Sequence, residues 1–433
     1  MNTATLNTPL GLVMKTDLQK DFSTVLNSDA MDFIIALHEK FNNKRLSLLE
    51  QRVMKTDLAS EQKSHSADPD IEVLRLSTEP LDVSTSMKLT AKTLVNSDFS
   101  PKYVKQLIVS LDGKNYEENC QEHQAIFEFL RDQNIDSSIY FEPRSLATRE
   151  ANLSIHELEA SAALYDFGLY FFNNAYELVN LEKNPSFTLS GIYSAEEAKW
   201  WNDVFVFAQS YIGLPSGTIK AQVDLSTVPA IQNIEGILFE LKQHLVFTSF
   251  DTRAYLISHV KRYFQVSRMT MPNLDQISIE SPFLTTVIDY IVHSSHRMSV
   301  PCIVNTHISN DLKRDFQLDF NRVVDKGFDG AFVRNQAEAD YVNDLLSKNN
   351  QISNKRLDLT GIAINLERTP TGTITEQGVA QCLRHFKNSI ASSFSELTTD
   401  ESLEILILKN WINHECLTVS GKKIDLNYCL SIR

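Results

Sequence analysis

Charged and polar side chains alternate at the ends of two predicted strands. Glu142 ends one strand and Arg144 follows it, while Asp224 and Ser226 lie at the end of another. Because successive side chains of a strand point to opposite faces, the members of each pair share a face. A third acid, Asp251, follows the next predicted strand. Side chains at strand ends are well placed for chemistry, because the active sites of parallel α/β folds usually lie there.

Patterns typical of other chemistries are missing from the sequence. The chain has five scattered cysteines, none paired with a neighbour at metal-binding spacing, so we expect reduced thiols. His293 and His296 are three residues apart, but no third ligand accompanies them, and a helix surface explains them better. The sequence contains no nucleophile elbow, phosphate-binding loop or dinucleotide fingerprint.

Composition limits the class of protein. At 433 residues with 42% hydrophobic and 22% charged residues, the chain has the profile of a soluble globular protein. A net charge of −14 argues against nucleic-acid and anionic-membrane partners, which need a basic surface. The sequence shows no apolar run long enough to span a bilayer, and its first residues do not resemble a signal peptide. We therefore expect a cytoplasmic protein.

The segment 196–244 shows how the chain would position these side chains. Glu196–Tyr211 carries apolar residues at steps of three and four, which predicts a helix. A turn at Gly213–Gly217 leads into an apolar strand, Ile219–Leu225, and a second helix is expected over Ile234–Gln243. Helix, strand and helix form one unit of a parallel α/β fold, whose chemistry usually lies where strands end, here Leu225–Pro229.

The same alternation recurs along the chain and predicts a (β/α)8 barrel of the TIM type. Seven strands are expected, at Lys105–Leu111, Ser138–Glu142, Ser186–Leu189, Ile219–Leu225, Leu245–Ser249, Cys302–Asn305 and Gly330–Val333. The region Ile155–Leu181 is expected to be helical throughout. The eighth strand is the weak point, and only Ser389–Phe394 offers a replacement near the end of the chain.

Three regions are expected. Residues 1–100 would form an N-terminal arm with a helical and extended segment, including a helix over Ala30–Arg52 and a short strand at Met87–Lys92. Residues 101–365 would form the barrel core, and residues 366–433 a shortened C-terminal helical region.

Five segments resemble malate synthases. They are YDFGLYFFNNA at 165–175, WWNDVFVFAQ at 200–209, GLPSGTIKA at 213–221, EGILFELKQH at 235–244 and FDG at 328–330. The match is collinear over most of the chain. It implies an acyltransferase of the glyoxylate cycle that joins acetyl-CoA to glyoxylate and releases malate and CoA. Such a reaction needs a carboxylate base, a cation that stabilises the enolate, and Mg²⁺ held by carboxylates.

This sequence departs from the family where that chemistry is carried out. The position of the family's catalytic arginine holds Glu142, and Arg144 could take over or be a surface residue. The two Mg²⁺ ligands fall on Ser226 and Ala254, neither of which is a carboxylate. Asp224 and Asp251 lie near and could form a relocated site, although a hard octahedral ion tolerates little displacement.

The base loop and the pocket are also altered. The place of the proton-abstracting aspartate falls on Leu397, with Glu396 adjacent, in a loop that is about ten residues shorter than the family's. A solvated helix start explains these acids better than a base does. Asn305, His307 and Arg334 replace smaller or different pocket residues.

Several substitutions at distinct functional places favour a malate-synthase-like protein that is catalytically impaired or inactive, a pseudoenzyme with a binding or regulatory role. The alternative is an active malate synthase whose relocated groups are Arg144, Asp224, Asp251 and Glu396. A different reaction on the same barrel stays open as well. We expect no cofactor, or Mg²⁺ under the active alternative only. The resemblance makes acetyl-CoA and glyoxylate the candidate small-molecule partners.

Overall fold

We analysed a computed structural model of the chain. It describes residues 12–14, 21–57, 65–66, 81–94, 102–132, 136–306, 316–349, 363–366, 368–384 and 402–432. The candidate strand Ser389–Phe394 and the residues His307, Glu396 and Leu397 lie outside these ranges.

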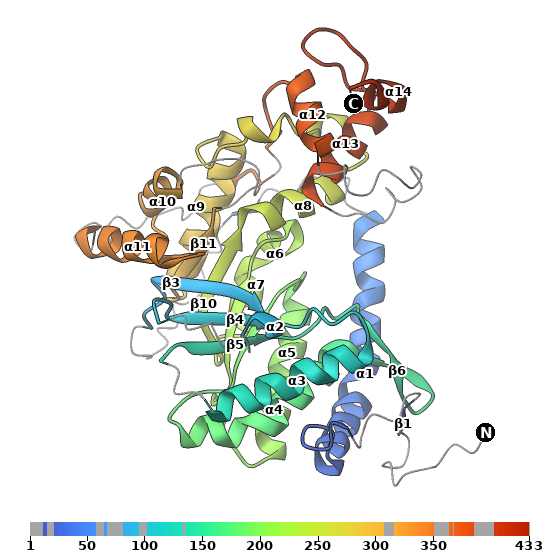
Figure 1. The fold of residues 1–433 in the computed structure, drawn as a ribbon, viewed down its shortest axis with the longest axis vertical. Coiled ribbons are helices and arrows are strands. Elements are labelled where there is room, and N and C mark those ends of the chain that lie inside the picture. The colour runs from blue at the N-terminus through green and yellow to red at the C-terminus, as the bar shows by residue number, and fades with distance from the viewer. Residues whose placement is uncertain are drawn as a thin grey trace.

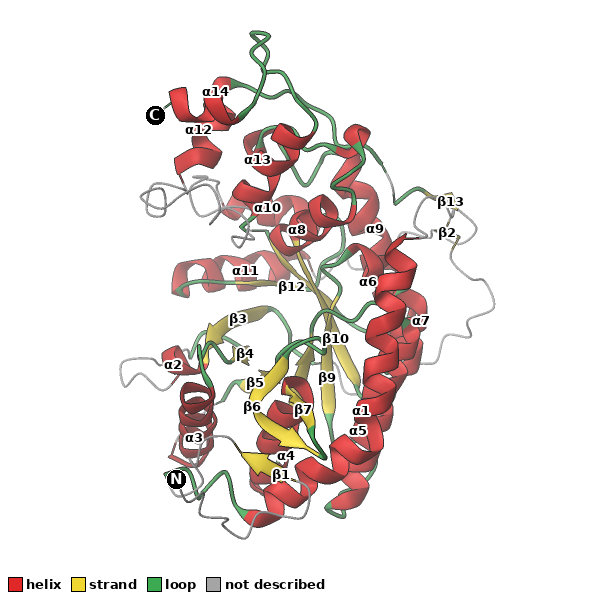
Figure 2. Ribbon diagram, turned by 90° about the vertical axis from the view of Figure 1, so that its right-hand side faces the viewer, coloured by secondary structure: helices red, strands yellow, loops and turns green. Residues whose placement is uncertain are grey.

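Eight parallel strands close into a barrel, which confirms the predicted fold class (Figures 1 and 2). Their order around the ring is β10-β11-β12-β3-β4-β5-β8-β9. The strands are β3 Thr85–Thr90, β4 Gln106–Ser110, β5 Ser138–Glu142, β8 Ser186–Leu189, β9 Lys220–Asp224, β10 Leu245–Asp251, β11 Cys302–Asn305 and β12 Gly330–Phe332.

The strand that closes the ring is β3, which precedes the first barrel strand expected from the sequence. It pairs with β12 through Ala331 and Thr85, and with β4 through Ser86 and Gln106. The ring is therefore complete without a strand from the C-terminal region. A Cβ on Gly330 would lie 2.1 Å from the carbonyl oxygen of Val83, so glycine is what lets β12 begin beside the chain that enters β3.

Helices surround the barrel. They are α2 Ala91–Leu94, α3 Tyr116–Asp132, α4 Ala162–Asn180, α5 Ala195–Tyr211, α6 Val228–Gln232, α7 Ile234–Glu240, α8 Thr252–Arg262, α9 Pro282–Arg297, α10 Phe316–Val324 and α11 Gln336–Asn349. Between the strands and this layer lies an aromatic core. The rings of Phe141 and Tyr170 stack at 4.5 Å, and those of Phe167 and Phe187 lie 4.8 Å apart.

One expected helix is shorter than predicted. Residues 149–161 form an antiparallel hairpin, β6 Arg149–Ile155 and β7 Leu158–Ser161, and α4 begins only at Ala162. The turn residues His156 and Glu157 have φ angles of 49° and 67°, which a continuous helix does not allow. The N-terminal strand β1 Leu12–Met14 pairs with β6, so part of the expected loose arm is anchored.

A long helix, α1 Ser28–Asp57, runs beside α4 and α5 (Figure 2). Its close approach to α4 depends on Gly168, where a Cβ would lie 2.8 Å from Ile34 Cγ1. The indole of Trp200 donates a hydrogen bond to the carbonyl of Phe41 at 3.0 Å. Arg52 on the same helix binds Glu197 of α5 at 2.6 Å.

The C-terminal helices pack near α8 at one end of the molecule (Figure 1). They are α12 Glu376–Arg384, α13 Leu403–Asn413 and α14 Leu426–Ser431. Outside the barrel, two short strands, β2 His65–Ser66 and β13 Ala363–Ile364, pair with each other. The indole of Trp411 donates to the carbonyl of Met271 at 2.7 Å. The division at residues 100 and 365 stays a prediction, and β3 shows that barrel residues begin before residue 100.

Candidate active site

The carboxyl ends of β9, β10 and β11 bring four of the predicted residues into one hydrogen-bonded cluster. The hydroxyl of Ser226 donates to Asp224 and accepts from the backbone N–H of Asp251 at 2.7 Å. The side-chain amide of Asn305 donates to Asp251 at 2.6 Å. Parallel strands end at the same edge of a barrel, which is why residues so distant in sequence meet here.

Asp251 uses both carboxylate oxygens within the protein. Oδ1 accepts from the backbone N–H of Ala254 at 2.8 Å, which makes Asp251 the N-cap of α8, and Oδ2 accepts from Asn305. Asp251 is therefore held by the fold in a structural role.

A lysine that sequence reasoning did not single out faces this cluster. The ammonium of Lys88, on β3, forms an ion pair with Glu142, on β5, at 2.7 Å. Burial lowers the pKa of Lys88, but the charges of Glu142, Asp224 and Asp251 outweigh it and raise the pKa. Asp224 and Asp251 lie on the other side of the ring from β3, so the Lys88 side chain extends into the barrel mouth.

The reversed charge at Glu142 thus has a compensating cation. The Glu142 side chain is only 10% exposed, and burying a carboxylate is costly unless an opposite charge accompanies it. The sequence feature that could have identified Lys88 is its place in the extended segment 87–92. The predicted barrel begins one strand later, so Lys88 is not among the predicted residues at strand ends.

Asp224 has an environment suited to a neutral carboxyl group. Burial raises its pKa to about 7, while the hydrogen bond from Ser226 and the charge of Lys88 lower it. The nearby carboxylates Asp251 and Glu142 add to the rise. A group that titrates close to neutral pH can accept or donate a proton at the mouth of the barrel.

Below the mouth, the barrel interior holds polar atoms that lack a partner among the described residues. They include the hydroxyls of Ser86 and Thr188 and the side-chain oxygen of Gln222, all from buried residues. Ser86 lies two residues before Lys88, and Gln222 lies two residues before Asp224, so strand alternation turns them toward the same interior. Gln222 donates to Ser249 at 2.6 Å, and Ser249 donates to Asp224 at 3.4 Å, which links this layer to the cluster above.

Arg144 does not join this cluster in the structure. Its guanidinium makes two hydrogen bonds to Asp166 of α4, at 2.8 and 2.7 Å, and one to Glu150 at 2.9 Å. Burial raises the pKa of Asp166, but the Arg144 charge outweighs it and holds the pKa at about 2. Arg144 therefore links β5 to the helix layer, and a catalytic role for it stays a prediction.

Arg334 also lies apart. Its guanidinium binds Glu338, one turn further along the chain, at 2.5 Å, and its side chain is 55% exposed. Five of the expected pocket residues are therefore connected by hydrogen bonds: Asp224, Ser226, Asp251, Ala254 and Asn305. Arg334 and the catalytic candidate Arg144 each form a separate ion pair.

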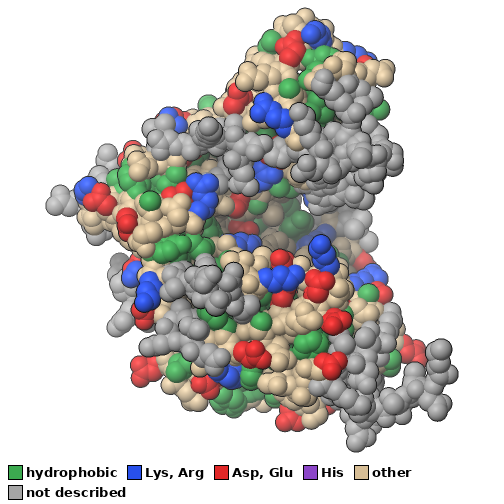
Figure 3. Space-filling model, in the orientation of Figure 1, with side chains coloured by type: hydrophobic (Ala, Val, Ile, Leu, Met, Phe, Trp, Pro, Cys, Tyr) green, Lys and Arg blue, Asp and Glu red, His purple; other side chains and the backbone are tan. Residues whose placement is uncertain are grey.

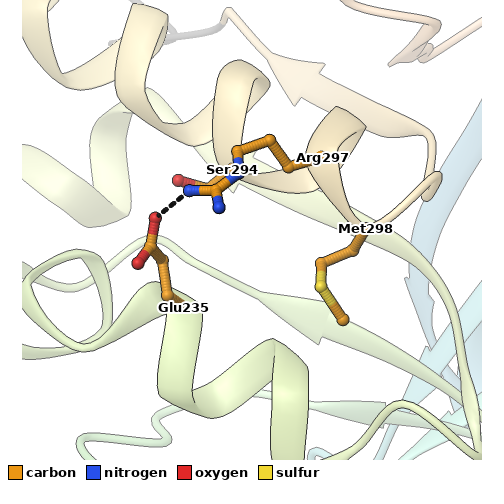
Figure 4. A pocket seen from close by; sticks show the side chains of 4 residues that line it. All are labelled: Glu235, Ser294, Arg297 and Met298. Carbon is orange, nitrogen blue, oxygen red and sulfur yellow. Dashed lines mark hydrogen bonds and ion pairs between the residues drawn. The ribbon is translucent and has the colours of Figure 1, made fainter. Parts of the chain in front are cut away.

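A small hollow lies elsewhere, between α7 and α9. Glu235, Ser294, Arg297 and Met298 line it, and the Glu235–Arg297 ion pair at 2.9 Å spans it (Figure 4). Both helices belong to the outer layer, so this hollow is separate from the strand ends. A second hollow, with acidic and basic side chains around it, lies between the barrel and the C-terminal helices (Figure 3).

Comparison with known proteins identifies the family. The family model described as malate synthase, TIM barrel domain, matches residues 139–359. The chain belongs to the malate synthase family. A malate synthase from Myxococcus xanthus is 28% identical, and the match covers 96% of this chain and 86% of that protein. One from Dictyostelium discoideum is 29% identical over 70% of this chain, but the match covers only 54% of the relative.

Solved structures give a weaker match. A magnesium and glyoxylate complex of Haloferax volcanii malate synthase has a TM-score of 0.48 and 11% identity, covering 75% of this chain and 88% of that one. The assignment to the malate synthase family therefore rests on the sequence match.

The side chains present do not fit the magnesium ion expected from the family. Mg²⁺ requires several oxygen ligands in near-ideal octahedral geometry. Each Asp251 oxygen already accepts a hydrogen bond, from Ala254 or Asn305, and Asp224 has a pKa near neutral. The positive charge of Lys88 interacts with both carboxylates and would repel a divalent cation bound between them. Within the described ranges, no group of three or more His, Cys, Asp or Glu side chains is arranged to hold a metal.

Proposed function

We propose that this malate-synthase-family barrel is impaired or inactive in the condensation of acetyl-CoA with glyoxylate, and that it acts by binding a ligand. The main support is that the carboxylates of Asp251 and Glu142 already have partners within the protein. One carboxylate caps a helix and accepts from an amide, and the other is paired with a lysine. Carboxylates that are already satisfied have little to gain from a metal ion.

The absence of a metal-binding acid at two positions supports the same proposal. Ser226 donates its hydroxyl to Asp224, and Ala254 contributes only its backbone N–H to Asp251. The family reaction needs a Lewis acid on the aldehyde oxygen and a cation near the enolate. Lys88 supplies one positive charge at the mouth, where the family's chemistry needs two separate electrophilic groups.

An active enzyme with relocated groups is the second candidate, and Asp224 favours it. Its pKa of about 7 is close to the optimum for a general base near neutral pH, and Lys88 faces it as a cation. In this case Asp224 would remove the methyl proton and Lys88 would stabilise the enolate. For Arg144 to take part, its guanidinium would have to leave Asp166. Glu396, the other candidate, lies outside the described residues.

Release of CoA thiol from acetyl-CoA in the presence of glyoxylate and Mg²⁺ tests the proposal. We expect the folded protein to show no release above a sample without glyoxylate. Release that depends on both substrates would contradict impairment. Asp224→Asn and Arg144→Ala would then separate the candidates, because only a residue that carries the chemistry should lower kcat while the protein stays folded.

Partners and location are proposed on family grounds. Acetyl-CoA and glyoxylate, or compounds like them, are the ligands that membership of the malate synthase family implies. Of the helices that the structure describes, none is long and apolar enough to cross a bilayer. We propose a cytoplasmic site of action, in keeping with the free cysteines.

A further inference from the structure

A histidine without hydrogen bonds lies where α8 packs against α9. The His259 side chain is fully buried, and neither ring nitrogen has a hydrogen-bond partner in the part of the chain that the structure describes. Three rings form an aromatic cage around the imidazole, with centroid distances of 4.8 Å to Phe283 of α9, 4.8 Å to Tyr263 and 6.2 Å to Tyr255. Buried polar atoms nearly always have partners, and an unpaired imidazole costs free energy that an apolar side chain would not. The histidine therefore indicates a role beyond packing.

The aromatic cage suits the neutral imidazole and opposes the protonated one. Burial lowers the pKa of His259 to about 3, from an ordinary value of 6.5. A protonated ring has two N–H donors, and the cage leaves both of them without an acceptor. If α8 moves away from α9, water reaches the ring and its pKa returns to the ordinary value. The packed arrangement is therefore fully favoured above pH 6.5, and this preference is lost progressively as the pH falls from 6.5 towards 3.

The charged groups of α8, α13 and β10 are paired with one another. Glu404 of α13 binds Arg253 of α8, and Asp251 at the end of β10 caps α8. In the cage itself, burial raises the pKa of the Tyr255 phenol, which is therefore uncharged near neutral pH. Burial alone accounts for the lowered pKa of His259.

The remaining elements around α8 follow the same rule. On α9, the carboxylate of Asp289 pairs with Lys326, while His293 and His296 lie in later turns of that helix. The helix α6 has no ionisable side chain, and burial raises the pKa of Cys302 on β11. Each of the acids on these elements already has a partner, so protonation of His259 would add a charge that the surroundings do not balance.

The chain that follows α8 carries an attachment of the C-terminal helices. The carbonyl of Phe264 accepts hydrogen bonds from the side-chain amide of Asn410 at 3.0 Å and from Nε2 of His414 at 2.8 Å. Because a carbonyl only accepts, Nε2 of His414 carries a hydrogen, and protonation of its other nitrogen would keep this bond. Together with the pair between Arg253 and Glu404, these bonds attach α13 near both ends of α8. A movement of α8 would therefore be passed on to α13.

We propose that His259 is an acid-sensitive latch, which holds α8 against α9 while its ring is neutral and lets α8 and the attached α13 move away when the ring takes up a proton. Asp251 at the barrel mouth caps the same helix, so opening of the latch would also disturb the cluster of Asp251, Ser226 and Asn305. This inference goes beyond the proposed function and does not depend on whether the barrel is catalytically active.

Hydrogen exchange of the whole protein at pH 7 and at pH 5 tests the latch, with rates corrected for the intrinsic effect of pH on exchange. For the α13 amides, we expect the equilibrium constant for opening to rise by about 20-fold more in the unmodified protein than in His259→Phe, since opening raises the His259 pKa from about 3 to 6.5. His259→Phe keeps an aromatic ring in the cage but cannot be protonated. His156→Gln, at an exposed turn between β6 and β7, is the matched control and should respond to pH like the unmodified protein.

A second variant separates the latch from packing effects. His259→Leu also removes the titrating ring, and its smaller side chain avoids any crowding that phenylalanine introduces. We expect it to respond to pH like His259→Phe. The inference is overturned if both variants respond like the unmodified protein. It is also overturned if α13 in the unmodified protein opens no more readily at pH 5 than at pH 7, a result that needs no variant.

Discussion

At the scale of residues, the mouth of the barrel shows how one substitution is compensated by another side chain. Glu142 reverses the charge expected for the family, and Lys88 from a neighbouring part of the ring supplies the opposite charge at 2.7 Å. Strand alternation predicted that Asp224 and Ser226 share a face, and their hydrogen bond confirms it. The same rule placed Arg144 beside Glu142, but the chain leaves the strand at Pro143 and turns Arg144 toward Asp166.

Asp224 makes stability depend on pH. Its folded pKa of about 7 lies above the value of about 3.9 for an unfolded aspartate. The neutral form therefore stabilises the fold fully below about pH 4, and this contribution is lost as pH rises through 7. The side chain of Asp224→Asn cannot ionise, so the variant should not lose stability in this way. Between pH 5 and 8, its free energy of unfolding should therefore rise relative to that of the unmodified protein, by at most roughly 4 kcal/mol.

Urea unfolding at pH 5 and at pH 8 measures the difference in free energy of unfolding between Asp224→Asn and the unmodified protein. Asp203→Asn, on the exposed surface of α5, is the control for removing a carboxylate without burial. If the gap between Asp224→Asn and the unmodified protein is the same at both pH values, Asp224 does not have the raised pKa that its surroundings give it.

At the scale of elements, the alternation of strands and helices was predictable, while the identity of the closing strand was not. Seven strands followed from apolar runs separated by amphipathic helices, and all seven are in the ring. One face of β3 is polar, with Ser86, Lys88 and Thr90, because that face lines the mouth. A functional interior thus weakens the hydrophobic signal on which strand prediction depends.

The contact between α13 and α8 is a second element-scale feature that the sequence did not reveal. Arg253 forms two hydrogen bonds with Glu404, at 2.9 and 2.7 Å, and the Glu404 side chain is 1% exposed. Arg253 follows Asp251 by two residues, so this pair attaches the C-terminal helices beside the mouth.

Glu404→Gln should loosen this attachment. The variant removes the buried carboxylate charge that pairs with Arg253, and we expect a loss of about 1–3 kcal/mol in the free energy of unfolding because Arg253 is partly exposed. Hydrogen exchange of the α13 backbone should accelerate more than that of the barrel strands. Asp203→Asn, which breaks an exposed pair with Lys199, should cost less than about 0.5 kcal/mol. Equal effects of the two variants would show that the Arg253–Glu404 pair does not attach α13.

At the scale of the whole molecule, the segments that reveal the family are mostly those that build its scaffold. Phe167, Tyr170 and Trp201 come from these segments, and all three are buried between the barrel and its helices. Packing of this kind constrains sequence strongly, so the fold and family could be predicted from it. The site depends on a few polar residues brought together from five strands, and local patterns do not specify such contacts.

Titration of the purified protein with Mg²⁺ in a calorimeter tests the central claim most directly. The carboxylates at the barrel mouth are satisfied by Lys88, Asn305 and the N-terminus of α8, so they should not supply a metal site. We predict no stoichiometric binding at millimolar Mg²⁺. Tight binding of one ion per chain, abolished by Asp224→Asn, would contradict this account.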